Sequence, residues 1–181
     1  MPQITIGAAQ SFMEAALGDI GLPASNATQV AEAILDSELR GHPDHGLYFC
    51  RDVIIGMHQS GLINPTPNVR IVKDSSLVTI VDGDKDCVVG MNAAMDASIA
   101  KAKSHGMSAG SVINSSYVVA TDRPRRIRWK PDVEEIFYAG ERGQKRMARL
   151  REEGIVPLGE AAWEAVLGMS EEHGVPVPEL A

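Results

Sequence analysis

Over the first sixty positions, apolar residues recur at three- and four-residue spacing, which is typical of helices that bury one side. The three helices predicted by this spacing cover residues 7–17, 25–40 and 46–60. Ser25 and Asp44 stand at the start of the second and third segments, so we expect their side chains to act as N-caps. Gly41 and Gly61 follow the same two segments and are expected to end them.

The helical spacing gives way to strand signals after a stiff, proline-containing connector at 64–67. The further predicted elements are a hairpin of strands 69–72 and 77–81, a helix at 88–105, a strand at 107–113, and helices at 141–151 and 158–172. This order predicts an α+β fold. It has a helical N-terminal part, a small mixed sheet with a hairpin, and C-terminal helices that pack back on the N-terminal part.

Composition narrows the class of protein. The chain has 181 residues, of which 44% are hydrophobic, and this is enough for one core. Its net charge of −7 argues against a nucleic-acid partner or an anionic membrane surface, since both require a basic face. We find no apolar run of transmembrane length and no secretory signal. Cys50 and Cys87 lack metal-binding spacing, so we expect two buried thiols in a cytoplasmic protein.

The most informative motif is the stretch at 41–46, GHPDHG, which lies between two predicted helices. His42 and His45 are three residues apart, with Asp44 between them. Three interpretations compete. A metal site would need a third ligand that the neighbouring sequence does not offer. A plain loop would leave both histidines solvated and Asp44 as a helix cap. A catalytic loop would use a histidine as general acid and base, since the ordinary imidazole pKa suits neutral pH.

Six segments in order resemble the malate/L-lactate/ureidoglycolate dehydrogenase family of NAD(P)-dependent oxidoreductases. They are 40–47 (RGHPDHGL), 61–65 (GLINP), 81–84 (VDGD), 106–114, 137–142 (FYAGER) and 154–157 (GIVP) with Trp163. The resemblance implies a cofactor, NAD or NADP, and a small 2-oxo or 2-hydroxy acid as substrate. It also implies that His45 donates the proton to the substrate carbonyl.

The same resemblance suggests further contacts. The candidate substrate-binding residues are Arg40, Arg51, Asn114 and Tyr117, and the candidate cofactor-binding residues are Gly140 and Glu141. Tyr117 stands where the family usually has a histidine. For the two arginines, which are candidates for the substrate carboxylate, a solvated surface position is the competing interpretation. No metal is expected.

The chain departs from the family in length. Family members carry a cofactor-binding segment between the Asn-Ser motif and the 137–142 turn, and here only 117–138 spans that interval. No GxGxxG fingerprint replaces it. The basic run at 123–130 is either a phosphate-binding patch or the scar of a lost segment or shifted frame. The expected organisation is 1–117 as the N-terminal part of the family's first domain, 118–132 as a basic linker or junction, and 133–181 as the C-terminal part of the same domain.

Two functions remain open from the sequence. One is a malate/lactate-type dehydrogenase that is weak or inactive alone because the central segment is missing. The other is a non-catalytic oligomerisation or regulatory remnant of such an enzyme. We expect weak binding of NADH or NADPH. We also expect a homodimer, with Phe49 or Ile55 of the third helix at or near the contact because that helix carries surplus apolar residues.

Overall fold

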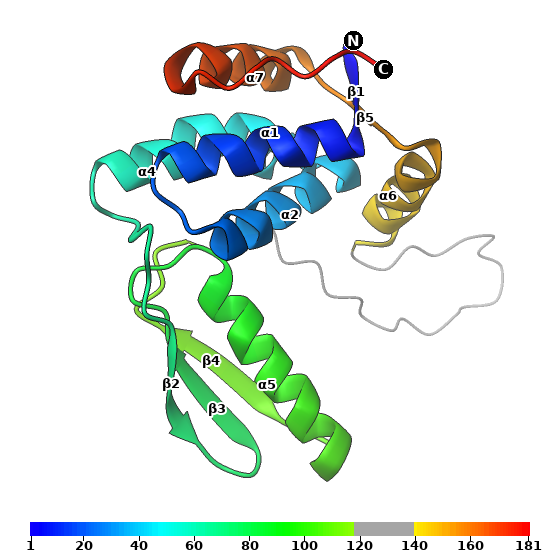
Figure 1. Cartoon of the computed structure of the whole chain (residues 1–181). Coiled ribbons are helices and arrows are strands. Elements are labelled where there is room, and N and C mark those ends of the chain that lie inside the picture. Colours follow the sequence, from blue (N-terminus) through cyan, green and yellow to red (C-terminus); the bar gives the residue numbers. More distant parts are fainter. Residues whose placement is uncertain (118–139) are drawn as a thin grey trace, which may run out of the picture.

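A computed structural model describes residues 1–117 and 140–181, which form a helical lobe and a smaller sheet lobe (Figure 1). The predicted basic linker at 118–132 lies entirely outside the described residues, so the domain boundaries stay predictions. The helical lobe holds β1 (Gln3–Thr5), α1 (Ile6–Asp19), α2 (Ala24–Arg40), η1 (Pro43–His45), α3 (Leu47–Phe49), η2 (Cys50–Ile55), α4 (Gly56–Gln59), α6 (Glu141–Glu153), β5 (Ile155–Pro157) and α7 (Glu160–His173). The sheet lobe holds β2 (Arg70–Asp74), β3 (Val78–Asp82), α5 (Val89–His105) and β4 (Ala109–Ile113). The α+β prediction is confirmed.

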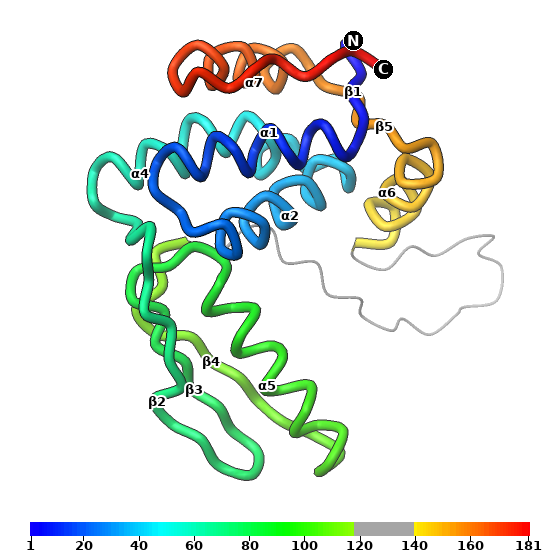
Figure 2. The backbone as a smooth tube through the Cα atoms, viewed as in Figure 1, coloured from blue at the N-terminus to red at the C-terminus, as the bar shows by residue number. Residues whose placement is uncertain are grey.

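The beginning and the end of the chain meet in the helical lobe. β1 pairs antiparallel with β5, with Ile4 opposite Val156, and the backbone N–H of Ala181 donates to the Gln3 carbonyl at 2.8 Å. Figure 2 shows the two termini side by side. α7 packs on α1, and α6 packs on α2. The prediction that the C-terminal helices pack back on the N-terminal part is therefore confirmed, although the short β1–β5 pair was not foreseen.

Two of the predicted helix caps are wrong. α2 begins at Ala24 after Pro23, and the Ser25 side chain instead donates to the Asn26 side chain inside the first turn. Pro23 occupies the N-cap position with φ −56°, and its carbonyl accepts the Asn26 and Ala27 N–H groups at 2.9 Å. Asp44 lies within η1, and α3 starts after Gly46 with no side-chain cap.

The segment predicted as the third helix, 46–60, is helical, but the type of helix changes along it. Its middle, η2, is π-helical, between the short α-helical pieces α3 and α4. The expectation that Phe49 and Ile55 face a partner is wrong, because they are only 5% and 2% exposed. Their side chains are used within the chain, where α3 and η2 pack against α7. These two residues are therefore not the contact of the predicted homodimer. Dimerisation itself stays a prediction.

The sheet lobe contains the predicted hairpin, followed by the predicted helix and strand. β2 pairs antiparallel with β3, and β3 pairs parallel with β4, with Val81 opposite Val112. α5 connects β3 to β4 and contacts both strands. Thr79 and Val81 of β3 are fully buried, whereas the side chains of β2 are exposed.

The two lobes meet at a junction where segments 62–68, 83–88 and 114–117 are hydrogen-bonded to one another. The Asn64 N–H donates to the Lys85 carbonyl at 2.9 Å, and the Ser116 N–H donates to the Asp86 carbonyl at 3.0 Å. Val88 ends this junction with φ +74°, a conformation that costs a β-branched residue energy and that the surrounding bonds must hold. The junction fixes the 114–117 segment against the helical lobe.

Both cysteines are buried free thiols, as predicted. Burial raises the pKa of each thiol to about 12. Within residues 1–117 and 140–181, no helix has the length and apolar character needed to cross a membrane.

Candidate active site

The motif loop at 41–46 rests on a buried carboxylate. Glu38, in the last turn of α2, is 5% exposed, and its Oε2 accepts the Leu47 N–H at 3.0 Å. Gly46 lies so close to this carboxylate that a Cβ there would overlap it. Burial raises the pKa of Glu38, while the Leu47 hydrogen bond and the Arg146 charge oppose that rise. Glycine at position 46 therefore leaves room for the buried Glu38 carboxylate.

The same loop is fixed from the side by α6. The Arg146 guanidinium donates to the carbonyl oxygens of Glu38 and Leu39 at 2.7 and 2.6 Å, which satisfies two acceptors at the end of α2. Gly41 then turns the chain with φ +87°, and the Arg146 side chain lies against it. A C-terminal helix thus positions the loop that carries His42 and His45.

His45 lies in a cluster of aromatic rings. Its ring stacks on Phe49 at a centroid distance of 5.6 Å, and Phe49 in turn packs on the Tyr117 ring at 4.8 Å. The His45 Nε2 lies 3.5 Å from the Tyr117 hydroxyl, and its Nδ1 lies 3.2 Å from the Asp44 carboxylate. Two residues that the sequence singled out separately, 72 positions apart, are thereby brought together. The His45 side chain is 30% exposed, so a small molecule can reach the ring.

Tyr117 is held in place by the junction between the lobes. It pairs with Cys87 in an isolated parallel bridge, and the preceding Ser116 hydroxyl donates to the Leu62 carbonyl. Asp86, fully buried beneath this segment, accepts the Gly90 N–H at the start of α5, and burial raises its pKa. The aromatic cluster is therefore anchored from both lobes.

Asn114 is engaged at the end of β4. It adopts φ +54°, its amide donates to Asp82 Oδ1 at 3.1 Å, and its carbonyl accepts the Lys85 N–H at 2.6 Å. This amide hydrogen bond, the Asp84 N–H and Arg70 lower the pKa of Asp82. These bonds give Asn114 a structural role at the junction.

The two candidate arginines are engaged by carboxylates. Arg40 Nε donates to Asp36 Oδ2 at 2.6 Å along α2. Arg51 donates to Glu172 of α7 at 2.6 Å, and this hydrogen bond raises the pKa of Arg51. Its guanidinium also lies against Gly168 of α7. Neither of these pairings brings a guanidinium to the His45 ring.

The candidate cofactor residues stand at the start of α6. Gly140 adopts φ +88°, and Glu141 occupies the first turn, where its carboxylate lies 3.5 Å from Lys145. A helix N-terminus attracts anions, and here the Glu141 side chain already supplies one.

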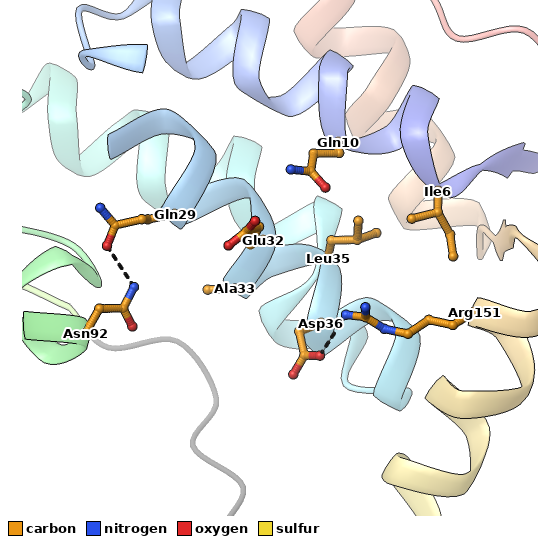
Figure 3. Close-up of a pocket in the computed structure, with 9 residues that line it drawn as sticks. All are labelled: Ile6, Gln10, Gln29, Glu32, Ala33, Leu35, Asp36, Asn92 and Arg151. Carbon is orange, nitrogen blue, oxygen red and sulfur yellow. Dashed lines mark hydrogen bonds and ion pairs between the residues drawn. The ribbon is translucent and has the colours of Figure 1, made fainter. Parts of the chain in front are cut away.

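A separate cleft of about 480 Å³ lies along the outer side of α2 (Figure 3). Its lining residues are Ile6, Gln10, Gln29, Glu32, Ala33, Leu35, Asp36, Asn92 and Arg151. Arg151 lies 3.5 Å from Asp36, and the Asn92 amide donates to Gln29 across the two lobes at 2.9 Å. Its lining includes none of the predicted site residues.

Sequence reasoning missed three positioning residues of this site. Glu38 is a charged residue on the buried side of a helix, and its role follows from the hydrogen bond that it accepts from the Leu47 N–H in the motif loop. Arg146 lies in a highly charged helix in which no single arginine stands out. Phe49 was assigned to a subunit contact, whereas it fills the space between His45 and Tyr117. No group of three potential metal-binding side chains occurs within residues 1–117 and 140–181.

Comparisons with known proteins identify the family. A family model described as malate/L-lactate dehydrogenase matches residues 4–123, about two thirds of the chain. The L-sulfolactate dehydrogenase of Methanocaldococcus jannaschii is 33% identical over 103 residues, which cover 56% of this chain and 29% of that protein. The malate dehydrogenase of Pyrococcus abyssi is 32% identical over 59% of this chain and 30% of its own length.

The fold agrees with solved structures. The malate dehydrogenase of Entamoeba histolytica superposes with a TM-score of 0.60 and 30% identity, covering 64% of this chain and 32% of that one. The Pyrococcus horikoshii enzyme gives a TM-score of 0.58 at 26% identity. The chain spans about a third of the length of the relatives that it matches. It belongs to the malate/L-lactate dehydrogenase family.

Proposed function

We propose that this chain carries the proton-donating part of a 2-hydroxy acid dehydrogenase site, centred on His45. The observation that carries the proposal is the His45–Tyr117 pair, in which a ring nitrogen and a hydroxyl from distant segments face each other at 3.5 Å. The names of the matched relatives, malate and L-sulfolactate dehydrogenase, both denote enzymes of 2-hydroxy acids. A small 2-oxo or 2-hydroxy acid is the proposed ligand.

His45 would work as an acid in the following way. The Asp44 carboxylate lies 3.2 Å from Nδ1 and favours a proton on that nitrogen, so we assign the proton exchange with the substrate to Nε2. A carbonyl oxygen placed between Nε2 and the Tyr117 hydroxyl can accept two hydrogen bonds. As that oxygen gains negative charge, the tyrosine hydroxyl stabilises the developing alkoxide and the protonated imidazole gives it a proton, so that the product is the neutral alcohol.

The family implies NAD or NADP as hydride donor, and the described residues do not fit the pyrophosphate of that cofactor. A pyrophosphate cradle needs free N–H donors or cations at a helix N-terminus. At α6, the helix that the sequence suggested, the first turn carries the Glu141 carboxylate, whose negative charge disfavours a pyrophosphate there. Gly140 and Glu141 remain in the proposal only as contacts to the ribose. The ribose hydroxyls can donate hydrogen bonds to the Glu141 carboxylate. We therefore derive no hydride step, and we expect weak activity or none from this chain alone.

The substrate carboxylate needs a cation or amide donors. Arg40 and Arg51 remain the proposed residues, and each would have to release its carboxylate partner, Asp36 or Glu172, to reach a ligand. Asn114 would likewise have to leave Asp82. These competing bonds predict low affinity for the free acid.

The alternative function, a non-catalytic oligomerisation part, is favoured by one observation. Most of the large exposed apolar side chains belong to the sheet lobe, among them Ile99, Met107 and Ile113. Such a surface is typical of a protein contact. It lies on a different lobe from the aromatic cluster, so the two functions can be tested separately.

The test is a titration with 2-oxo and 2-hydroxy acids, followed by NMR of the imidazole protons. We expect the His45 resonances to shift and those of His105, at the far end of α5, to stay constant. If NADH- or NADPH-dependent reduction is measurable, His45→Ala should lower kcat by about 10²-fold or more. His42→Ala in the same loop is the matched control and should retain activity. A His45 signal that no acid perturbs, or unchanged turnover in His45→Ala, would rule the proposal out.

A further inference from the structure

The outer edge of β4 is unpaired among the described strands, and the hydrogen bonds show which of its groups are available. β4 is the last strand in the order β2-β3-β4. The Ala109 N–H donates to Leu77, and the Ile113 carbonyl accepts the Gly83 N–H, so both of these residues bond toward β3. In a parallel ladder, alternate residues bond to the same neighbour. Ser111 therefore also faces β3, and Gly110 and Val112 direct their N–H and C=O groups outward.

This edge carries none of the usual protection against pairing. The β4 sequence, AGSVI, contains no charged residue and no proline. Gly110 cannot be replaced by a larger residue, because a Cβ there would overlap the Ser98 side chain of α5. Two outward N–H groups and two outward carbonyls thus form an open and uncharged edge.

A groove of about 1010 Å³ runs between this edge and α5. Met91 and Met95 of α5 form one wall, and β4 forms the other. Met95 is 40% exposed, and Ile99, one turn further along α5, is 46% exposed. The groove therefore offers apolar side chains directly above unpaired backbone groups.

We propose that two copies of this chain join through β4, antiparallel about a two-fold axis through Ser111. The register follows from the outward groups. Gly110 and Val112 of the partner subunit exchange both backbone hydrogen bonds, and the symmetric pair does the same, which gives four bonds in all. The two three-stranded sheets then form one continuous sheet. This inference does not depend on the proton-donor function, and it specifies the contact that the alternative oligomerisation function would use.

The position of α5 favours a second copy over a free peptide. α5 contacts both β3 and β4, so it lies over the line between these strands. With strands about 4.8 Å apart, two such helices related by the axis would lie about 10 Å apart on one face of the sheet. Packed helix axes are separated by about 8–10 Å. A second copy therefore fills each groove with the Met91 and Met95 side chains of the other α5, whereas a lone strand would leave them exposed.

The test measures mass by light scattering at concentrations from one to one hundred micromolar. We expect the wild type to approach twice the 19.4 kDa chain mass at the upper end. Met95→Glu, which brings two carboxylates together near the axis, should lower the dimer affinity by about 10²-fold or more, because each would be buried without a partner. Leu167→Glu on α7 is the matched control, because Leu167 is 42% exposed, and it should leave the dimer intact.

A second variant and a second measurement address the strand pairing itself. Val112→Pro removes an outward N–H without removing a bond to β3, and it should also give a monomer with an unchanged circular dichroism spectrum. Amide exchange should protect the Gly110 and Val112 N–H groups only at high concentration, and Ala109 at all concentrations. A monomer throughout the range would overturn the proposal. So would a dimer that survives both Met95→Glu and Val112→Pro.

Discussion

The two lobes of this protein bury their apolar residues to very different degrees. The helical lobe supplies almost all of the largest fully buried side chains: Ile4, Met13, Leu17, Val30, Ile34, Leu39, Leu47, Ile54, Leu150, Leu158 and Met169. The sheet lobe contributes Val81 to the same set. In contrast, the sheet lobe exposes Ile71, Val72, Leu77, Val78, Met95, Ile99, Met107 and Ile113.

This difference shows which part of the chain has a closed core. The helical lobe closes on itself because the two ends of the chain meet there, through β1, β5, α6 and α7. The sheet lobe has one helix on a three-stranded sheet and an open edge. His45 belongs to the closed lobe and Tyr117 to the junction, so the proton-donor site depends on both.

The largest expected effect is on the free energy of unfolding, and it compares one substitution in the helical lobe with one in the sheet lobe. Leu39→Ala, in the fully buried part of α2, should lower the free energy of unfolding by about 2–5 kcal/mol, because it leaves a cavity. Ile71→Ala, on exposed β2, should change it by only about 0.5 kcal/mol. Urea titration followed by circular dichroism measures both. Equal losses would mean that the sheet lobe buries far more than its side chains indicate.

The next effect concerns the contact beneath the motif loop. Gly46→Ala should destabilise the protein by about 1–3 kcal/mol, because the new methyl group meets the buried Glu38 carboxylate. Gly56→Ala is the matched control. Its Cβ would meet nothing and its φ is −61°, so this helical site should gain about 0.4–1 kcal/mol. Thermal unfolding distinguishes the two, and a neutral Gly46→Ala would show that the loop is not held by Glu38.

A third prediction separates the lobes by chemical labelling. With thiol pKa values of about 12, neither cysteine should react with iodoacetamide at pH 8 in the native state. In mild urea, Cys87 at the junction should be alkylated before Cys50, because the sheet lobe opens without the helical core. Mass spectrometry of the two peptides gives the order. Simultaneous labelling would indicate that the lobes unfold as one unit.

The smallest effect is a pH dependence at Glu38. Burial raises its pKa in the folded protein above the ordinary 4.5, so the folded state holds this proton more tightly than the unfolded state. The stability that this group contributes is present below pH 4.5 and is lost as pH rises through the folded pKa. Glu38→Gln cannot titrate. The stability of the wild type relative to this variant should therefore fall as pH rises, and a constant difference would argue against a raised pKa.

Much of the fold could be predicted from the sequence because the spacing of apolar residues indicates which side of a helix or strand is buried. The helices at 25–40 and 88–105 and the hairpin were found in this way. The β1–β5 pair could not be found, because three-residue strands carry no period and their partner lies about 150 residues away. The π-helical turn at 50–55, which packs against α7, has no local signal in the sequence either.

The candidate site was only partly predictable. Family motifs pointed to His45 and Tyr117, and the structure brings them together. Apolar spacing made Phe49 look like surplus surface, because a sequence cannot show that an aromatic ring fills the gap between two other rings. Arg40 pairs with Asp36 one turn earlier in the same helix. Arg51 pairs with Glu172 of α7 through a tertiary contact. The residue type of the two arginines alone reveals neither pairing.

The most direct test of the central claim is a calorimetric titration of the chain with NADH and with NADPH. We propose that the chain retains the proton donor and that its described residues do not form a pyrophosphate cradle. We therefore expect no saturable binding in the micromolar range for either cofactor, while a 2-oxo acid still perturbs the His45 resonances. Micromolar or tighter binding of NADH or NADPH to the wild type would contradict this proposal.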